Sequence, residues 1–290
     1  MKKLMIFLLI ALLTCSTALA TDEVRWTYDV PLLEIQSEYA ILVNEDNLLE
    51  KTYTPSPLMT VKGVKKATNA TVEMQETAGN ALKAMFEAAA QVTEYTYTTS
   101  SGTTKTVTYE NGMILYLKSG YRSYSKQQIT YSNHLQSNNN IDDGYVAKPG
   151  ASEHQTGLCA DILNADYASR PLMTQDFKWT PEAQWMKEHC AEFGFILRYT
   201  EEGEAATGIK FEPWHFRYVG EKTAAYIMSK GMTLEDYILE ATAAVEDFIA
   251  RGGDLEEQMA YERLHSERLP ECVILEEYSE DGSQEIDLIF

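Results

Sequence analysis

The stretch Gly150-Ala-Ser-Glu-His-Gln-Thr-Gly-Leu-Cys-Ala-Asp161 organises this chain of 290 residues. It places His154 and Asp161 seven residues apart, with Gly157 between them to let the backbone bend. About fifty residues further on, Glu212-Pro-Trp-His215 supplies a second imidazole and a second carboxylate. Two imidazoles and one carboxylate suit a catalytic zinc ion, which takes three protein ligands and keeps one position open. His154, Asp161 and His215 are therefore the candidate ligands of one zinc ion per chain.

Glu212 is left over as a candidate general base. It lies three residues before His215, close enough to reach a water beside the metal rather than the metal itself. A carboxylate there can take the proton from water and later pass it to a leaving amine. Each residue alone is a weak signal, because a single His is usually a surface or satisfied core residue and an Asp beside a Gly is often a turn or a helix cap.

Six segments, taken together, resemble one family. The segments 152–161 and 212–220 resemble the two zinc motifs of the D-alanyl-D-alanine carboxypeptidase (VanY-type) family of metallopeptidases, and Ser119-Gly-Tyr-Arg-Ser123 resembles its third motif. The other matches lie at residues 42–47, 193–199 and 232–237, in the family's order over about residues 39 to 240. Cys159 departs from the family, which usually has Ala at that position, and Leu48 stands where Pro is common.

The resemblance implies an α+β fold, in which a small, mostly antiparallel sheet flanked by helices holds zinc in a surface groove, as in hedgehog- and DD-peptidase-like proteins. It implies an exported enzyme that hydrolyses the terminal D-Ala-D-Ala bond of peptidoglycan stem peptides, with Glu212 as base and then acid on a zinc-bound water. Two other functions stay open: an L,D-carboxypeptidase that acts on stem tetrapeptides, and a non-catalytic zinc-stabilised binding module. Glu212 counts against the module, because a purely structural zinc site needs no base.

Arg122 is the candidate for recognising the terminal carboxylate of the substrate. A guanidinium binds a carboxylate through two parallel hydrogen bonds. The alternative is a structural Arg paired with an acid, and the resemblance favours the role in substrate binding. The resemblance also assigns substrate contacts to Gln127 and Ser152. Arg198 and Arg217 flank the site in sequence, and their roles stay undecided.

The first twenty residues are typical of a secretory signal peptide. Lys2 and Lys3 precede an apolar run over 4–13, and Ala18-Leu-Ala20 is a cleavage site of small residues. We expect an extracytoplasmic protein, secreted or at the cell wall, without a stable membrane span after cleavage; an N-terminal anchor is the alternative. The formal net charge of −20 argues against nucleic acid as a partner.

The cysteines that follow residue 20 do not form a disulfide framework. They are Cys159, Cys190 and Cys272, which is an odd number. Cys159 lies two residues before Asp161, so it is either a competing metal ligand or, as we favour, a small side chain packed beneath the site.

Residues 21–240 are expected to form the catalytic domain, and residues 241–290 an extension without an assigned role. Period-two alternation around Ser100-Ser-Gly-Thr103 predicts a β-hairpin over about 94–110, inserted relative to the family, which either flanks the substrate groove or is simply exposed. Apolar periodicity and turn signals predict the remaining elements: helices over 71–92, 125–135, 180–192 and 221–249, and strands over 39–43, 113–117, 158–163 and 195–199, with a second hairpin near the C-terminus.

Overall fold

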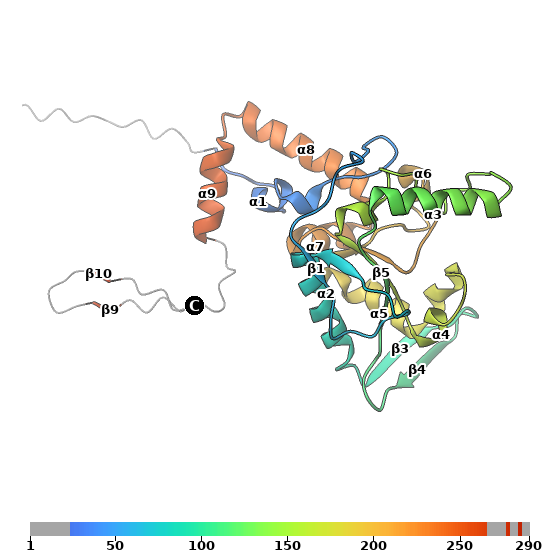
Figure 1. Cartoon of the computed structure of the whole chain (residues 1–290). Helices are drawn as coiled ribbons and strands as arrows, with labels where there is room; N and C mark the ends of the chain where they lie inside the picture. The colour runs from blue at the N-terminus through green and yellow to red at the C-terminus, as the bar shows by residue number, and fades with distance from the viewer. Residues whose placement is uncertain (1–23, 266–276, 279–283, 286–290) are drawn as a thin grey trace, which may run out of the picture.

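A four-stranded antiparallel sheet lies at the centre of the protein (Figure 1). The structure is a computed structural model that describes residues 24–265, 277–278 and 284–285; the predicted signal peptide and Cys272 lie outside these residues. The strand order is β5 (Tyr116–Ser119), β6 (Cys159–Leu163), β8 (His215–Tyr218) and β7 (Phe195–Leu197). The predicted small, mostly antiparallel sheet flanked by helices is thereby confirmed.

The two faces of this sheet carry different side chains, because successive residues of a strand point to opposite faces. Ala160 and Phe216 face each other across β6 and β8 and belong to the apolar core. Asp161 and His215 form the next pair in the register, so both point to the other face. All five residues of β6 are buried, which places the two predicted metal ligands of this pair in the interior.

Helix α2 (Glu76–Ala89) covers the apolar face of the sheet. Its buried side chains include Leu82 and Met85, which share one core cluster with Phe216. The helix begins at Glu76 rather than at the predicted residue 71, because residues 73–75 form β2, paired with β1 (Leu58–Thr60). The Gln75 side chain then accepts hydrogen bonds from the backbone N–H groups of Thr77 and Ala78 and so caps the helix.

The predicted hairpin is present as β3 (Glu94–Thr98) and β4 (Thr104–Thr108). It is anchored on helix α5 (Pro181–His189): the Tyr95 hydroxyl donates to a Glu188 carboxylate oxygen at 2.7 Å, and the Thr98 N–H donates to Gln184 Oε1 at 2.9 Å. The hairpin is therefore docked against the body of the protein, at the end opposite to α8 and α9 (Figure 1).

The predicted single helix over 221–249 is wrong. The chain forms α7 (Glu221–Lys230) and α8 (Leu234–Ala250) instead. Gly231 adopts the left-handed conformation with φ of 63°, which ends α7. Thr233 and Asp236 then form a reciprocal capping box at the start of α8. The sequence contains both the Gly at 231 and the Thr233–Asp236 capping pattern, but the apolar periodicity continues through both helices and favoured a single helix.

Residues 241–265 pack back onto the N-terminal segment. Helix α9 (Leu255–His265) lies beside α1 (Leu32–Ile35), and the Glu262 carboxylate accepts the N–H groups of Leu32 and Leu33 at 3.0 and 2.9 Å (Figure 1). The domain boundary predicted at residue 240 falls inside α8, so that element is continuous across it.

For the remaining elements, the predicted type agrees with the structure better than the predicted first and last residues do. Residues 38–40 form a 3₁₀ turn and not part of a strand, so the strand predicted over 39–43 is wrong. The strand expected over 113–117 begins three residues later, as β5. None of the helices in the described ranges combines the length and the apolar character needed to cross a bilayer. The other described elements are α3 (Tyr124–Ser137), η2 (Glu153–Thr156), α4 (Ala165–Ala168), η3 (Gln175–Trp179), η4 (Cys190–Phe193), α6 (Glu204–Thr207), β9 (Glu277–Tyr278) and β10 (Gln284–Glu285), the last two paired with each other.

Candidate active site

His154 is held on a short 3₁₀ turn just before β6. Gly157 ends this turn with φ of 69°, and an added Cβ there would lie 3.0 Å from the backbone nitrogen of Gln75, so the position favours glycine. The His154 Nδ1 atom lies 2.7 Å from the Gly120 carbonyl oxygen. Because a carbonyl only accepts, Nδ1 carries the proton. The other nitrogen, Nε2, faces Asp161 Oδ2 at 3.4 Å.

The two oxygens of Asp161 approach two different imidazoles. Oδ2 faces His154, and Oδ1 lies 3.2 Å from His215 Nδ1. All three side chains are at least nine-tenths buried. Asp161 Oδ1 has no hydrogen-bond partner within the described residues, which is costly for a buried carboxylate oxygen unless a cation or a proton satisfies it.

Two overlapping sets of donor atoms could hold a metal ion. The atoms of His154, Cys159 and His215 lie within 4.8 Å of one another, and so do those of Asp161, Glu212 and His215. Neither set contains all three predicted ligands, His154, Asp161 and His215. The two oxygens of Asp161 nevertheless lie 3.4 and 3.2 Å from the two imidazoles. Imidazole nitrogen, carboxylate oxygen and thiolate sulfur are the donors that zinc takes in proteins, so the residues present fit a zinc ion.

Glu212 lies in the turn that precedes β8 and not on a helix. Its Oε2 is 3.5 Å from His215 Nδ1, and its backbone carbonyl accepts the His215 N–H at 3.1 Å. Burial raises the pKa of the Glu212 carboxyl to about 7, although the charges of His215 and Arg122 act in the opposite direction. A carboxylate with such a pKa can accept and release a proton near neutral pH.

Arg122 follows β5, and its backbone lies against the turn that carries His154. Its backbone N–H donates to the His154 carbonyl at 2.9 Å, and its charge lowers the pKa values of both His154 and Glu212. No salt bridge to Arg122 is present among the described residues, and its Nε is buried without a hydrogen-bond partner there. The alternative of a structural ion pair therefore finds no support in this part of the chain.

Gln127 and Ser152, the two further residues expected to bind substrate, are both buried. Gln127 Nε2 donates to the Ala147 carbonyl at 2.6 Å, and its Oε1 lacks a partner within the described residues. Ser152 precedes the 3₁₀ turn of His154, and its side chain makes no capping hydrogen bond. Their contacts with a substrate stay a prediction.

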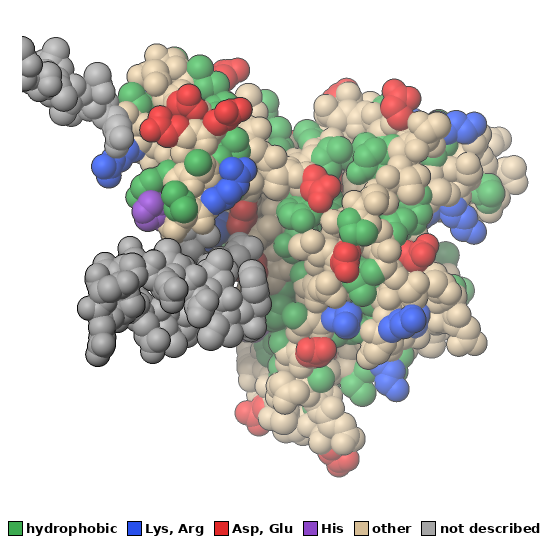
Figure 2. Space-filling view, turned by 60° about the vertical axis from the view of Figure 1, so that its left-hand side comes forward, with side chains coloured by type: hydrophobic (Ala, Val, Ile, Leu, Met, Phe, Trp, Pro, Cys, Tyr) green, Lys and Arg blue, Asp and Glu red, His purple; other side chains and the backbone are tan. Residues whose placement is uncertain are grey.

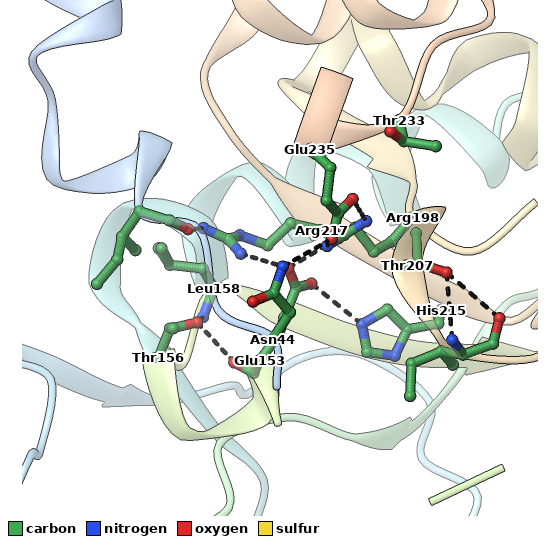
Figure 3. A network of polar contacts seen from close by, with 12 residues as sticks. Asn44, Glu153, Thr156, Leu158, Arg198, Thr207, His215, Arg217, Thr233 and Glu235 are labelled. Atoms are coloured by element: carbon green, nitrogen blue, oxygen red, sulfur yellow. Dashed lines mark hydrogen bonds and ion pairs between the residues drawn. The ribbon is translucent and has the colours of Figure 1, made fainter. Parts of the chain in front are cut away.

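Glu153 is a residue of this site that the sequence analysis missed. Its Oε1 accepts from Arg198 Nε at 2.8 Å and from Arg217 Nη1 at 2.7 Å, and its Oε2 lies 3.6 Å from His215 Nε2 (Figure 3). Burial alone would raise the pKa of Glu153, but the two guanidinium charges hold it well below its usual range. The available signal was an acid directly beside a predicted ligand His, together with Arg198, which follows β7, and Arg217 on β8.

Cys159 lies on the same face of β6 as Asp161 and is fully buried. Burial would raise the pKa of its thiol, but the charges of His154 and His215 lower it to about 7. Its position beneath the site agrees with the favoured interpretation, and its closeness to both imidazoles keeps the competing-ligand interpretation open.

The hairpin lines a pocket of about 780 Å³ next to the turn that carries Glu212. Thr98, Trp179, Phe211 and Pro213 are among its lining residues, whereas none of the predicted catalytic or metal-binding side chains is. His134 and His189 do not belong to the site: they pair with Asp143 and Glu192, each at 2.7 Å.

Comparison with known proteins identifies the family. A family model described as D-alanyl-D-alanine carboxypeptidase (VanY) matches residues 91–221. The carboxypeptidase-family protein YodJ of Bacillus subtilis is 33% identical over 201 residues, which cover 68% of this chain and 65% of YodJ. The match thus spans a little under two thirds of the length of that relative.

Two solved structures share the fold. The LD-carboxypeptidase LdcB is 32% identical, with a TM-score of 0.56 over 68% of this chain and 83% of LdcB. A mutant of the vancomycin-resistance D,D-pentapeptidase VanY, in complex with Zn(II), is 27% identical, with a TM-score of 0.50 over 69% of this chain and 98% of VanY. With the family model, the relatives and the shared α+β fold in agreement, this chain belongs to the VanY-type D-alanyl-D-alanine carboxypeptidase family.

Proposed function

We propose that this protein is an extracytoplasmic zinc carboxypeptidase that removes the terminal D-alanine from D-Ala-D-Ala-ending peptidoglycan stem peptides. The observation that carries the proposal is the convergence of His154, Asp161 and His215 beside a buried carboxyl, Glu212, whose pKa is about 7. The Zn(II) complex of VanY supports the choice of metal.

The metal would be held by His154 Nε2, by the Asp161 carboxylate and by His215 Nδ1, one ion per chain. A zinc ion bound there would lower the pKa of water and polarise the scissile carbonyl. The protein contributes the geometry, because the Gly120 carbonyl keeps the proton of His154 on Nδ1 and so leaves Nε2 free to bind.

Glu212 would act as the proton carrier. Its Oε2 lies beside His215 Nδ1, next to the shared donor set, so it can take a proton from the attacking water. The same oxygen then gives the proton to the amine of the leaving D-alanine, which cannot depart as an anion. Burial supports both steps, because it raises the pKa of Glu212 to about 7 in the metal-free protein.

Arg122 would bind the terminal carboxylate of the substrate. Its backbone N–H donates to the His154 carbonyl at 2.9 Å, and its charge lowers the pKa values of both His154 and Glu212, which supports a guanidinium close to the reacting groups. Its lack of an acidic partner in the described residues leaves it available for a bidentate pair with a substrate carboxylate. Gln127 and Ser152 complete the proposed substrate site.

An L,D-carboxypeptidase is the second candidate. The identity to LdcB is 32% and that to the D,D-pentapeptidase VanY is 27%, so the likeness to an LD-enzyme is at least as high. A non-catalytic module is disfavoured, since a buried carboxyl with a raised pKa beside the donor set has no use in a structural metal site.

The surface agrees with a substrate other than nucleic acid. Figure 2 shows Lys and Arg side chains as isolated spots among acidic ones, without a continuous basic surface on the visible face. The net charge of −20 over the whole chain also disfavours a polyanionic partner. The export signal over residues 1–20 and a catalytic domain over 21–240 complete the proposal.

Incubation of residues 21–290 with zinc and a stem pentapeptide, and separately with its tetrapeptide, tests the function by mass spectrometry. We expect loss of one D-alanine from the pentapeptide. Loss from the tetrapeptide alone would favour the L,D-enzyme, and cleavage of neither, with one zinc bound per chain, would contradict the carboxypeptidase proposal.

Glu212→Gln is the matching variant. Because general acid–base catalysis contributes about 10²–10⁴-fold, we expect turnover to fall by at least that much while zinc binding is kept. Loss of zinc from this variant would mean that Glu212 is a ligand and not the base.

A further inference from the structure

A buried, charge-balanced cluster lies behind His215. Two carboxylates, Glu153 and Glu235, face two guanidinium groups, Arg198 and Arg217 (Figure 3). The side chains of Glu153 and both arginines are fully buried. Burying four charged groups costs free energy of desolvation unless each group is paired and hydrogen-bonded. The partners of each group in the cluster therefore have to be accounted for.

The partners are nearly complete on the arginine side. Arg198 makes two parallel hydrogen bonds to Glu235, at 2.7 and 2.6 Å, and directs its Nε at Glu153. Arg217 donates from Nη2 to the carbonyls of Tyr39 and Ile41 at 3.0 and 2.7 Å, and from Nη1 to Glu153. The two guanidinium groups therefore hold Glu153 Oε1 from two directions.

Glu153 Oε2 and His215 Nε2 are the atoms left over. They lie 3.6 Å apart, both are buried, and neither has another hydrogen-bond partner within the described residues. A neutral imidazole carries one N–H, and an ionised carboxylate can only accept. A shift of a few tenths of an ångström would therefore close a bond from His215 Nε2–H to Glu153 and leave the lone pair on Nδ1, the atom that faces Asp161.

We propose that Glu153 is a positioning residue, which fixes the tautomer and the ring orientation of His215, and that Arg198 and Glu235 keep Glu153 in place. The inference rests on the proposed function in so far as His215 is a metal ligand. It extends the working site beyond the family match at residues 91–221, because Glu235 lies on α8 and the carbonyl groups that hold Arg217 belong to residues 39 and 41.

Glu153→Gln tests the inference in the full chain. The amide keeps the size of the side chain. Because Arg198 and Arg217 donate to the position of Oε1, the amide oxygen takes that place and the NH₂ group faces His215 Nε2, which must itself donate. We expect the zinc affinity, measured by competition with a chromogenic chelator, to fall about 10–100-fold, the range for lost partners of ligand histidines. Glu235→Gln should weaken zinc in the same direction by less, and the double variant by less than the product of the two fold-changes, because both act through one cluster.

Glu182→Gln is the matched control. Glu182 is also buried and accepts from Tyr109 and Asn164 at 3.0 and 2.9 Å, but it lies on α5, away from the cluster. We expect its zinc affinity to equal that of the wild type. An equal loss in Glu182→Gln and Glu153→Gln, or no loss in Glu153→Gln, would overturn the proposal.

The tautomer of His215 in the zinc-loaded wild type gives a readout that does not depend on whether a variant folds. Long-range ¹H–¹⁵N spectra should show His215 with its proton on Nε2 and the metal on Nδ1. A proton on Nδ1, or an absence of zinc binding by the wild type, would overturn the inference. Zinc bound with the expected tautomer, but no cleavage of either stem peptide, would contradict only the proposed function.

Discussion

Arg122 is the residue whose proposed role is most specific to a carboxypeptidase. Arg122→Ala should lower kcat/KM about 10–100-fold for peptides with a free terminal carboxylate, because a charged hydrogen bond contributes about 1.5–3 kcal/mol. The same peptides with an amidated terminus, assayed by mass spectrometry, should be cleaved equally by variant and wild type, though slowly. Arg170→Ala is the control, since Arg170 is paired with Asp166 at 2.5 Å on the surface. An equal loss on free and amidated peptides would contradict the recognition role.

As a proposed zinc ligand, His154 should make the binding of zinc dependent on pH. Burial and the charge of Arg122 act to lower the pKa of His154, but Cys159 and Asp161 outweigh them and raise it to about 9 in the metal-free protein. Because the metal binds the unprotonated nitrogen, the apparent zinc affinity should rise by about tenfold per pH unit for each displaced proton, up to about pH 9.

Cys159→Ala tests the cause of that dependence. Removal of the thiol removes one of the groups that raise the pKa of His154, so the rise in affinity should level off at a lower pH. Chelator competition between pH 6 and pH 9 measures both curves. A zinc affinity that is independent of pH in this range would contradict the expectation for the wild type.

At the scale of elements, the break between α7 and α8 depends on Gly231. Its φ of 63° lies in the left-handed region, where a side chain costs about 1–2 kcal/mol, and no atom within 4 Å would contact an added Cβ. Gly231→Ala should therefore lower the free energy of unfolding by about 1 kcal/mol through backbone strain alone. Gly231→Asn should cost less, because Asn tolerates this conformation better. Urea denaturation measures both, and equal losses would argue against strain as the cause.

At the scale of the whole molecule, α9 is attached to the catalytic body through the N-terminal segment. Glu262 caps two backbone N–H groups of α1, but the proposed zinc donors and the Glu153 cluster lie on other elements. A chain that ends at residue 254 should therefore keep its zinc affinity and peptidase activity while its Tm falls. Thermal unfolding and the stem-peptide assay check this; loss of zinc binding would show that the C-terminal extension is part of the site.

Residue types and local patterns along the sequence were enough to predict several elements of this protein and its candidate site residues. The hairpin over 94–110 follows from period-two alternation around a Gly-containing turn, and helix α5 follows from a Thr cap with Pro at the first position. The donor residues His154, Asp161 and His215 could be named from residue type and motif, because zinc chemistry restricts the choice. The structure places them together, and their binding of metal awaits the measurements above.

Other features could only be decided by the tertiary structure, because they depend on which strands are neighbours. Asp161 meets His215 through the register of β6 and β8, and Glu153 meets Arg198 and Arg217 across 45 and 64 residues of chain. Spacing along the sequence carries no information on such pairs. A buried carboxylate needs partners from every direction. Here they come from Arg198, directly after β7, and from Arg217 on β8, while helix α8 and the N-terminal segment hold the two arginines in place.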